Sequence, residues 1–185
     1  MSNRIVDVIK MEPTKKIEVR GWIKSFRANK FISLNDGSCL TSIQIVIEPD
    51  NFDTNTINGL NTGASIWVSG SLVESLGGGQ KTEISANEIR IIGNSNPEEL
   101  QKTILQPKKH SLEKLREQGH LRIRTNLFGA VFRIRHHMSF AIHKYFNDKG
   151  FFYIHTPIIT GTDAEGAGET FRVTTLPLGE KDIDV

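Results

Sequence analysis

The sequence has 185 residues, with 37% hydrophobic and 24% charged side chains and a net charge of +2. These proportions exclude a disordered chain, a collagen-like chain and a coiled-coil rod. The single cysteine, Cys39, excludes an intramolecular disulfide, and no apolar run approaches the roughly 20 residues of a membrane span. The start carries charges at Arg4, Asp7 and Lys10 and lacks the apolar core of a signal peptide, so we expect a cytoplasmic protein without membrane contact.

Residues 1–95 carry the alternating apolar pattern of short strands, separated by turn signals. The expected strands are Lys16–Lys24, Phe31–Leu34, Ser42–Ile47, Ser65–Glu74 and Thr82–Ile92. A mostly polar stretch between the third and fourth strands has Phe52, Ile57 and Leu60 at loose helical spacing. This order matches the OB-fold, a five-stranded all-β Greek-key barrel that binds oligonucleotides or oligosaccharides. A small barrel without a ligand is the alternative.

Residues 96–124 predict a structured linker. Asn96 followed by Pro97 and two acids starts one short helix, and Ser111 caps a second that Gly119 ends. Residues 101–150 hold 11 Lys/Arg against 3 Asp/Glu. Such a basic excess suits a polyanion, most commonly nucleic acid, although a solvated basic helix face gives the same count.

Residues 125–185 predict the start of an α+β domain. A long helix capped by Thr125 or Asn126 runs to Lys149, and it carries two adjoining apolar rows that need wide burial. These rows pack either on a sheet of the same chain or on a second subunit. Phe151–Ile159 predicts a strand interrupted by Pro157, and Phe171–Leu176 a further one. One helix with one or two strands cannot bury itself, so we expect this domain to be incomplete.

Two segments carry candidate binding residues, whereas no metal cluster, phosphate loop or catalytic motif is present in the sequence. The first is the barrel face, where an aromatic ring can stack on a base while polar side chains read its edge. Its candidates are Trp22, Arg27, Lys30, Phe31 and Gln44. The alternative for Phe31 is that its ring fills the barrel core.

The second segment is Glu165–Glu169, an acidic, glycine-rich loop. Its small residues allow a ligand to approach the backbone, and its carboxylates suit an ammonium group. An acidic surface loop without a ligand explains the same pattern.

Taken in order, these segments resemble the asparaginyl-tRNA synthetases, a family of class II aminoacyl-tRNA synthetases related to the aspartyl and lysyl enzymes. The run VRGWIKSFRANKFISLNDGS resembles the anticodon-binding OB-fold of that group. The run TNLFGAVFRIRHHMSFAIHKYFNDKGFFYIHTPIITGTDAEGAGETFRVTTL resembles motif 1 and the loop that follows it. HTPIIT, EGAGE and FRVTTL together point to asparagine rather than aspartate.

The resemblance implies roles for matching residues. Phe31 would stack on the central anticodon base, a uridine, while Gln44 would bond the edge of that base and Arg27 would hold it or its phosphate. Glu83 would read the first anticodon base, a guanine or its modified form. Glu165 would bind the α-ammonium group of asparagine. The dimer interface of a homodimer would include Phe132, Met138 and Pro157.

The resemblance also implies that the complete enzyme uses ATP and Mg²⁺ to activate asparagine and transfers it to tRNA(Asn). Motifs 2 and 3, which supply the arginines that grip ATP, do not occur before Val185. We therefore expect residues 1–185 to be catalytically inactive alone. A stand-alone OB-fold RNA-binding module and an aspartyl-tRNA synthetase fragment are the alternatives.

Overall fold

The structure, a computed structural model, describes residues 2–162, 166, 171 and 173–175. The chain divides into two compact units, Met1–Met138 and Ser139–Val185. We call them the barrel unit and the C-terminal unit, and each is described by itself.

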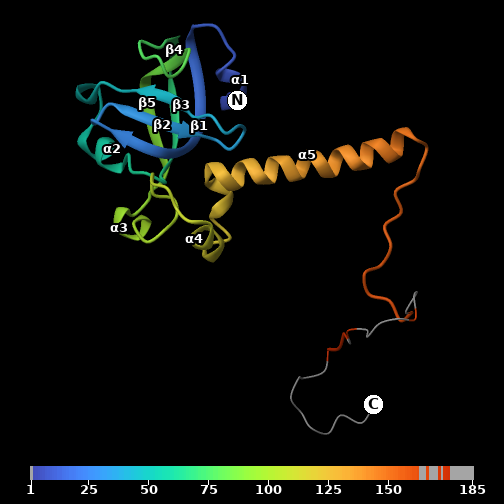
Figure 1. The fold of residues 1–185 in the computed structure, drawn as a ribbon. Coiled ribbons are helices and arrows are strands. Elements are labelled where there is room, and N and C mark those ends of the chain that lie inside the picture. Colours follow the sequence, from blue (N-terminus) through green and yellow to red (C-terminus); the bar gives the residue numbers. More distant parts are fainter. Residues whose placement is uncertain (1, 163–165, 167–170, 172, 176–185) are drawn as a thin grey trace. The chain divides into compact units, whose positions relative to one another are not determined.

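Five strands of the barrel unit close into a barrel (Figure 1). They are β1 (Thr14–Arg27), β2 (Phe31–Asn35), β3 (Ile43–Val46), β4 (Ser65–Glu74) and β5 (Thr82–Gly93). Their order around the barrel is β1-β2-β3-β5-β4, and β4 pairs back onto β1. All pairs are antiparallel except β3 with β5, which is parallel. The predicted five-stranded OB barrel is confirmed. Strand β1 extends two residues before and three residues after the expected Lys16–Lys24.

The barrel forms because most of the residues that point inward, every second one along a strand, are aliphatic. The buried core includes Ile17, Val19, Ile23, Ile32, Leu34, Ile43, Ile45, Ile66, Val68, Leu72 and Ile84. Each such side chain contributes about 1.5–3 kcal/mol by leaving water. Removing one, as in Ile32→Ala, is expected to cost about 2–5 kcal/mol because a cavity remains.

A short helix, α1 (Ile5–Val8), covers part of the core with two fully buried side chains, Ile5 and Val8. Its first turn is fixed by Asp36, whose carboxylate accepts a hydrogen bond from the backbone N–H of Ile5 at 2.9 Å. The sequence did not predict this helix because four residues are too few to show a helical period.

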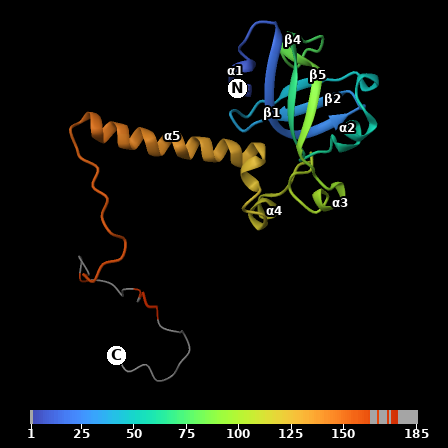
Figure 2. The same cartoon turned by 180° about the vertical axis from the view of Figure 1, so that it is seen from behind.

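Short helices connect the strands and then lead away from the barrel. Between β3 and β4 lie η1 (Pro49–Asn51) and α2 (Thr54–Gly59), and after β5 come α3 (Pro97–Leu100), α4 (Leu112–Glu117) and η2 (Arg122–Arg124). The predicted caps are confirmed, because Asn96 Oδ1 accepts from the N–H of Glu98 and Ser111 Oγ from that of Lys114. Figures 1 and 2 view the chain from opposite sides, and both show α3 and α4 beyond the end of the barrel at which β5 ends.

The long predicted helix is confirmed as α5 (Asn126–Asp148). Thr125 is the capping side chain, since its Oγ1 accepts from the N–H of Phe128 at 3.4 Å. Gly150 follows the helix with φ +85°, a conformation that favours glycine after a helix end. The helix therefore begins and ends where its sequence signals lie.

The C-terminal unit corrects one prediction, because Phe151–Ile159 is not a strand. A strand needs a second strand to supply its hydrogen bonds, and in the described residues none lies beside this segment. The described residues of the other predicted strand, at 171 and 173–175, are not in a strand either. None of the helices described is both long enough and apolar enough to span a membrane.

Candidate nucleic-acid interface

Four predicted base-binding residues lie on one outer face of the barrel, in two neighbouring rows. Strand register places Arg27 opposite Phe31, Phe31 opposite Val46 and Val46 opposite Ser85. We call this set the Phe31 row.

The second row lies two residues away along the strands, and we call it the Gln44 row. Ser25 pairs with Ser33, and Ser33 pairs with Gln44. Glu83 completes the row, because its carboxylate is hydrogen-bonded to Gln44. Four site residues are predicted individually from the sequence, and the barrel places them on the same face. They are Arg27, Phe31, Gln44 and Glu83.

A tight turn places Arg27 next to Phe31. Ala28, Asn29 and Lys30 connect β1 to β2, and the first two have φ values of +52° and +49°. The N–H of Lys30 donates to the carbonyl of Arg27 at 3.1 Å, so Ala28 and Asn29 are the central residues of a turn whose two positive φ values are those of type I′. Alanine rarely adopts this conformation, so the turn stores strain that the surrounding sheet must offset.

The polar centre of the face is a network on Glu83. Gln44 Nε2 donates to Glu83 Oε2 at 2.9 Å, and Ser75 Oγ donates to the same oxygen at 2.9 Å. In the described part of the chain Glu83 Oε1 accepts no hydrogen bond. The carboxylate is thus oriented by two donors and keeps one oxygen for a ligand.

Phe31 is half-buried and does not belong to the core cluster of the barrel. Its neighbour Ile32 is fully buried and occupies the inner side of β2. Because successive side chains of a strand point to opposite faces, the ring of Phe31 lies on the outer face. The structure therefore does not support the alternative in which Phe31 fills the core.

Two other residues of the predicted face are engaged within the protein. Lys30 Nζ forms an ion pair with Glu48 at 2.6 Å. The ring of Trp22 lies under the guanidinium of Arg124, which is 4.7 Å from the ring centroid. Trp22 pairs with Asn35 in the sheet, beyond the Gln44 row, so its ring is not adjacent to that of Phe31.

The remaining predicted site residues lie outside the barrel face. Phe132 is half-buried, with its ring 6.4 Å from that of Phe128 and the guanidinium of Arg122 5.8 Å from its centroid. Met138 is 58% exposed, and Pro157 lies in the segment that is not a strand. Glu165 falls outside the described residues, so its role stays a prediction.

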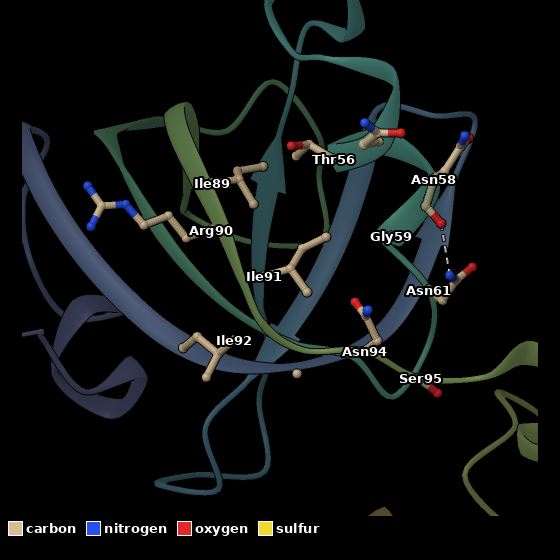
Figure 3. A pocket seen from close by; sticks show the side chains of 12 residues that line it. Thr56, Asn58, Gly59, Asn61, Ile89, Arg90, Ile91, Ile92, Asn94 and Ser95 are labelled. Atoms are coloured by element: carbon tan, nitrogen blue, oxygen red, sulfur yellow. Dashed lines mark hydrogen bonds between the residues drawn. The ribbon is translucent and has the colours of Figure 1, made fainter.

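A hollow of about 630 Å³ lies between α2 and the end of β5 (Figure 3). It is lined by Asn55, Thr56, Asn58, Gly59, Asn61, Ile89, Arg90, Ile91, Ile92, Gly93, Asn94 and Ser95. One asparagine is engaged locally, since Asn61 Nδ2 donates to the carbonyl of Asn58 at 2.9 Å. The charged residue Arg90 is paired with Glu88 and stacked on Trp67. This polar hollow contains none of the predicted site residues, and we assign it no chemistry.

The described residues contain no group of three or more His, Cys, Asp or Glu side chains that could hold a metal ion. Sequence reasoning missed two participants of the barrel unit, Ser75 and Arg124. Neither has a sequence signal, because each acts on a residue far along the chain, Ser75 on Glu83 and Arg124 on Trp22.

Comparison with protein families divides the chain in the same order as the fold. The family described as "OB-fold nucleic acid binding domain" matches residues 17–92. The family described as "tRNA synthetases class II (D, K and N)" matches residues 111–180.

Curated relatives extend this similarity over nearly the whole chain. The asparagine–tRNA ligase of Bacteroides fragilis is 51% identical over 182 residues, and that of Parabacteroides distasonis is 52% identical over 179 residues. Each match covers 95% of this chain but 38% of the relative. The chain therefore spans less than half the length of the relatives that it matches.

Solved structures show the same fold. The asparaginyl-tRNA synthetase of Entamoeba histolytica aligns with a TM-score of 0.72 at 24% identity, covering 88% of this chain and 39% of that one. The Pyrococcus horikoshii asparaginyl-tRNA synthetase complexed with asparaginyl-adenylate aligns with a TM-score of 0.70 at 18% identity, covering 85% and 37%. At these identities the comparison concerns the fold alone.

Proposed function

This chain belongs to the asparagine–tRNA ligase family, whose N-terminal portion it matches, and we propose that its barrel reads the anticodon of tRNA(Asn). The complete enzyme would use ATP and Mg²⁺ to activate asparagine and would transfer it to that tRNA in the cytoplasm. The observation that carries the proposal is the placement of Phe31, Gln44 and Glu83 side by side on one face of an OB barrel.

Phe31 and Gln44 are spaced to bind one base together. Gln44 lies two residues from Val46, the direct partner of Phe31, so the two side chains are diagonal neighbours. Such neighbours are about 7–8 Å apart in an antiparallel pair, which is close to the width of a base. A uridine stacked on the Phe31 ring would place its edge at the Gln44 amide, which can both donate and accept. Arg27, directly opposite Phe31, would hold the same nucleotide.

Glu83 would read the next base, the guanine at the first anticodon position. A carboxylate accepts two hydrogen bonds, and the Watson–Crick edge of guanine presents two N–H groups that cytosine and uracil do not offer together. Glu83 Oε2 is held by Gln44 and Ser75, so the group is oriented before RNA arrives. Preorganisation of this kind lowers the entropy lost on binding.

The rest of the proposal concerns α5 and the segments after it. Leu127, Val131, Ile134 and Met138 form an exposed apolar row along this helix. An apolar row of this length favours a homodimer in which Phe132, Met138 and Pro157 contribute to the interface. Glu165 would bind the ammonium group of asparagine. The domain limits 1–95, 96–124 and 125–185 belong to the same proposal.

A binding comparison tests the proposal. The complete 185-residue chain is titrated with the anticodon stem-loop of tRNA(Asn) and with loops altered only at the first or the middle base. We expect the cognate loop to bind most tightly, because each mismatch leaves one of the two readers unpaired. Equal affinity for all loops would mean that the barrel binds RNA without reading the anticodon. Failure to bind any loop would contradict RNA binding altogether.

A further inference from the structure

Two contacts join the outer side of β1 to the end of η2 and the start of α5 within the barrel unit. Arg124 stacks on the ring of Trp22, and Lys24 Nζ donates a hydrogen bond to Asn126 Oδ1 at 2.6 Å. Trp22 and Lys24 are two residues apart, as are Arg124 and Asn126, so the two segments run alongside each other. Lys24 and Arg124 are thereby brought together from positions 100 residues apart in the sequence.

These two cations have no acidic partner in the described part of the chain. Three other basic residues of the barrel are ion-paired there, Lys30 with Glu48, Lys81 with Glu12 and Arg90 with Glu88, whereas the remaining unpaired ones on its strands, such as Lys16 and Arg27, are exposed. Lys24 and Arg124 form no such pair, although both are half-buried.

Burial, and after it the charge of Arg124, lowers the pKa of the Lys24 ammonium group, and burial lowers the pKa of Arg124. Because both pKa values are lowered, the folded protein holds two positive charges in an environment that disfavours them. An anion bound between Lys24 and Arg124 would attract both cations. This attraction would outweigh their mutual repulsion and offset part of the free-energy cost of their desolvation.

We propose that Lys24 and Arg124 together bind one backbone phosphate of the RNA whose bases lie on the Phe31 and Gln44 rows. The inference rests on the proposed anticodon binding. A guanidinium offers two parallel N–H donors to a phosphate, and an ammonium adds a third donor from a different direction. Trp22 holds the guanidinium flat and so reduces the rotamer freedom lost on binding.

The position along β1 fits one continuous strand of RNA. Lys24 lies three residues before Arg27, and a strand rises about 3.3 Å per residue, so the two are roughly 10 Å apart. Lys24 is the residue at the register shift in the β1–β2 pairing, which lies between Ile23 and Ser25. The phosphate site would therefore lie one or two nucleotides from the base stacked on Phe31. It would add affinity without reading sequence.

The test is the salt dependence of RNA binding by the complete chain. Lys24→Gln, Arg124→Gln and the double variant are titrated with the cognate anticodon stem-loop at several salt concentrations. Lys16→Gln is the matched control, since it removes the same charge from an exposed position eight residues earlier on β1. For the double variant we expect the slope of log K against log[salt] to shrink by about 0.7–0.9, the value for one lost phosphate contact. The control should leave the slope unchanged, and the order of preference among loops should persist in all variants.

A second measurement locates the phosphate. Single phosphates of the stem-loop are replaced in turn by neutral methylphosphonates. One replacement should weaken binding to the wild-type chain and have no further effect on the double variant, because the partner of that phosphate is already gone.

Three outcomes are informative. If the wild type discriminates among loops but the double variant keeps the full salt slope, the phosphate site is wrong while anticodon reading stands. If the variants melt at lower temperature with an unchanged slope, the contact only fastens the linker to the barrel, which also overturns the proposal. Lys24→Gln controls for unfolding, because it removes one of the two charges and leaves the Arg124–Trp22 stack in place. If the wild type binds no RNA, the proposed function itself fails.

Discussion

Gln44 and Glu83, 39 residues apart in the sequence, are joined by a 2.9 Å hydrogen bond between the Gln44 amide nitrogen and the Glu83 carboxylate. The bond crosses the parallel pairing of β3 with β5, the one parallel pair of the barrel. Because of this pairing, the two residues that we propose read neighbouring bases can orient each other before RNA binds.

Gln44→Ala should reduce selectivity at the middle anticodon base. In the proposed site the variant would lose the amide that contacts the edge of uridine, while the Phe31 ring would still stack on any base. We expect the preference for uridine over cytidine to fall by about 1 kcal/mol, or roughly fivefold in relative affinity. Titration with the two stem-loops measures the ratio. An unchanged ratio would remove Gln44 from the reading site.

Ser75→Ala should weaken selectivity at the first anticodon base. Ser75 does not contact the base in this account, but it donates one of the two hydrogen bonds that orient Glu83. Losing it should lower the preference for guanine by about 1 kcal/mol and leave the middle-base preference intact. Ser71→Ala is the control, because Ser71 lies on β4, four residues before Ser75, and donates instead to the carbonyl of Lys15. Equal effects of the two substitutions would contradict the positioning role of Ser75.

Protonation of Asp36 at low pH should weaken the attachment of α1 to the barrel. Burial acts to raise the pKa of the Asp36 carboxyl, but hydrogen bonds from Ser38 and Ile5 outweigh it and hold the pKa below its ordinary 3.8. A depressed pKa contributes stability that is present above the unfolded value and lost as pH falls through the folded one. Asp36→Asn should therefore cost about 1 kcal/mol near neutral pH, a modest value because the carboxylate is partly exposed.

Thermal melts of wild type and Asp36→Asn from about pH 3 to about pH 7 measure this contribution. The difference between the two proteins should shrink below about pH 4. Asp50→Asn, at an exposed position of η1, should show no difference at any pH. A gap that persists in acid would mean that the carboxylate charge of Asp36 is not what secures α1.

The barrel was predictable from sequence because each strand shows the alternation of one buried and one exposed face. Ile17, Val19 and Ile23 mark the inner side of β1. Local chemistry likewise predicted the caps at Asn96 and Ser111, and for the long helix it left Thr125 and Asn126 as candidates, of which Thr125 is the one observed. These features depend only on residues close together in the chain.

Sequence reasoning missed one local feature without its usual signal and several relationships between distant residues. The type I′ turn at Ala28 and Asn29 lacks the glycine that usually signals it. The Ser75–Glu83 bond and the Arg124–Trp22 stack depend on how strands close the barrel. The strand expected at Phe151–Ile159 was wrong because alternation alone does not provide a partner strand.

Met138→Glu should weaken self-association of the chain. Met138 is 58% exposed on the apolar row of α5, and a carboxylate in an apolar interface has no partner to offset its desolvation. We expect the dissociation constant to rise by about tenfold or more. Sedimentation at several protein concentrations measures it, with His136→Glu on the polar face of the same helix as control. A wild-type chain that stays monomeric at all concentrations would refute the proposed dimer.

The central claim is that the Phe31 ring is a stacking platform for the middle anticodon base, and Phe31→Ala tests it most directly. The measurement is the affinity of the cognate stem-loop for wild type and variant, with thermal melts to establish that the variant barrel is folded. The account predicts a loss of about 1–3 kcal/mol, the usual contribution of one base–aromatic stack, with little change in melting temperature. A folded variant that binds the cognate loop as tightly as wild type would contradict the account.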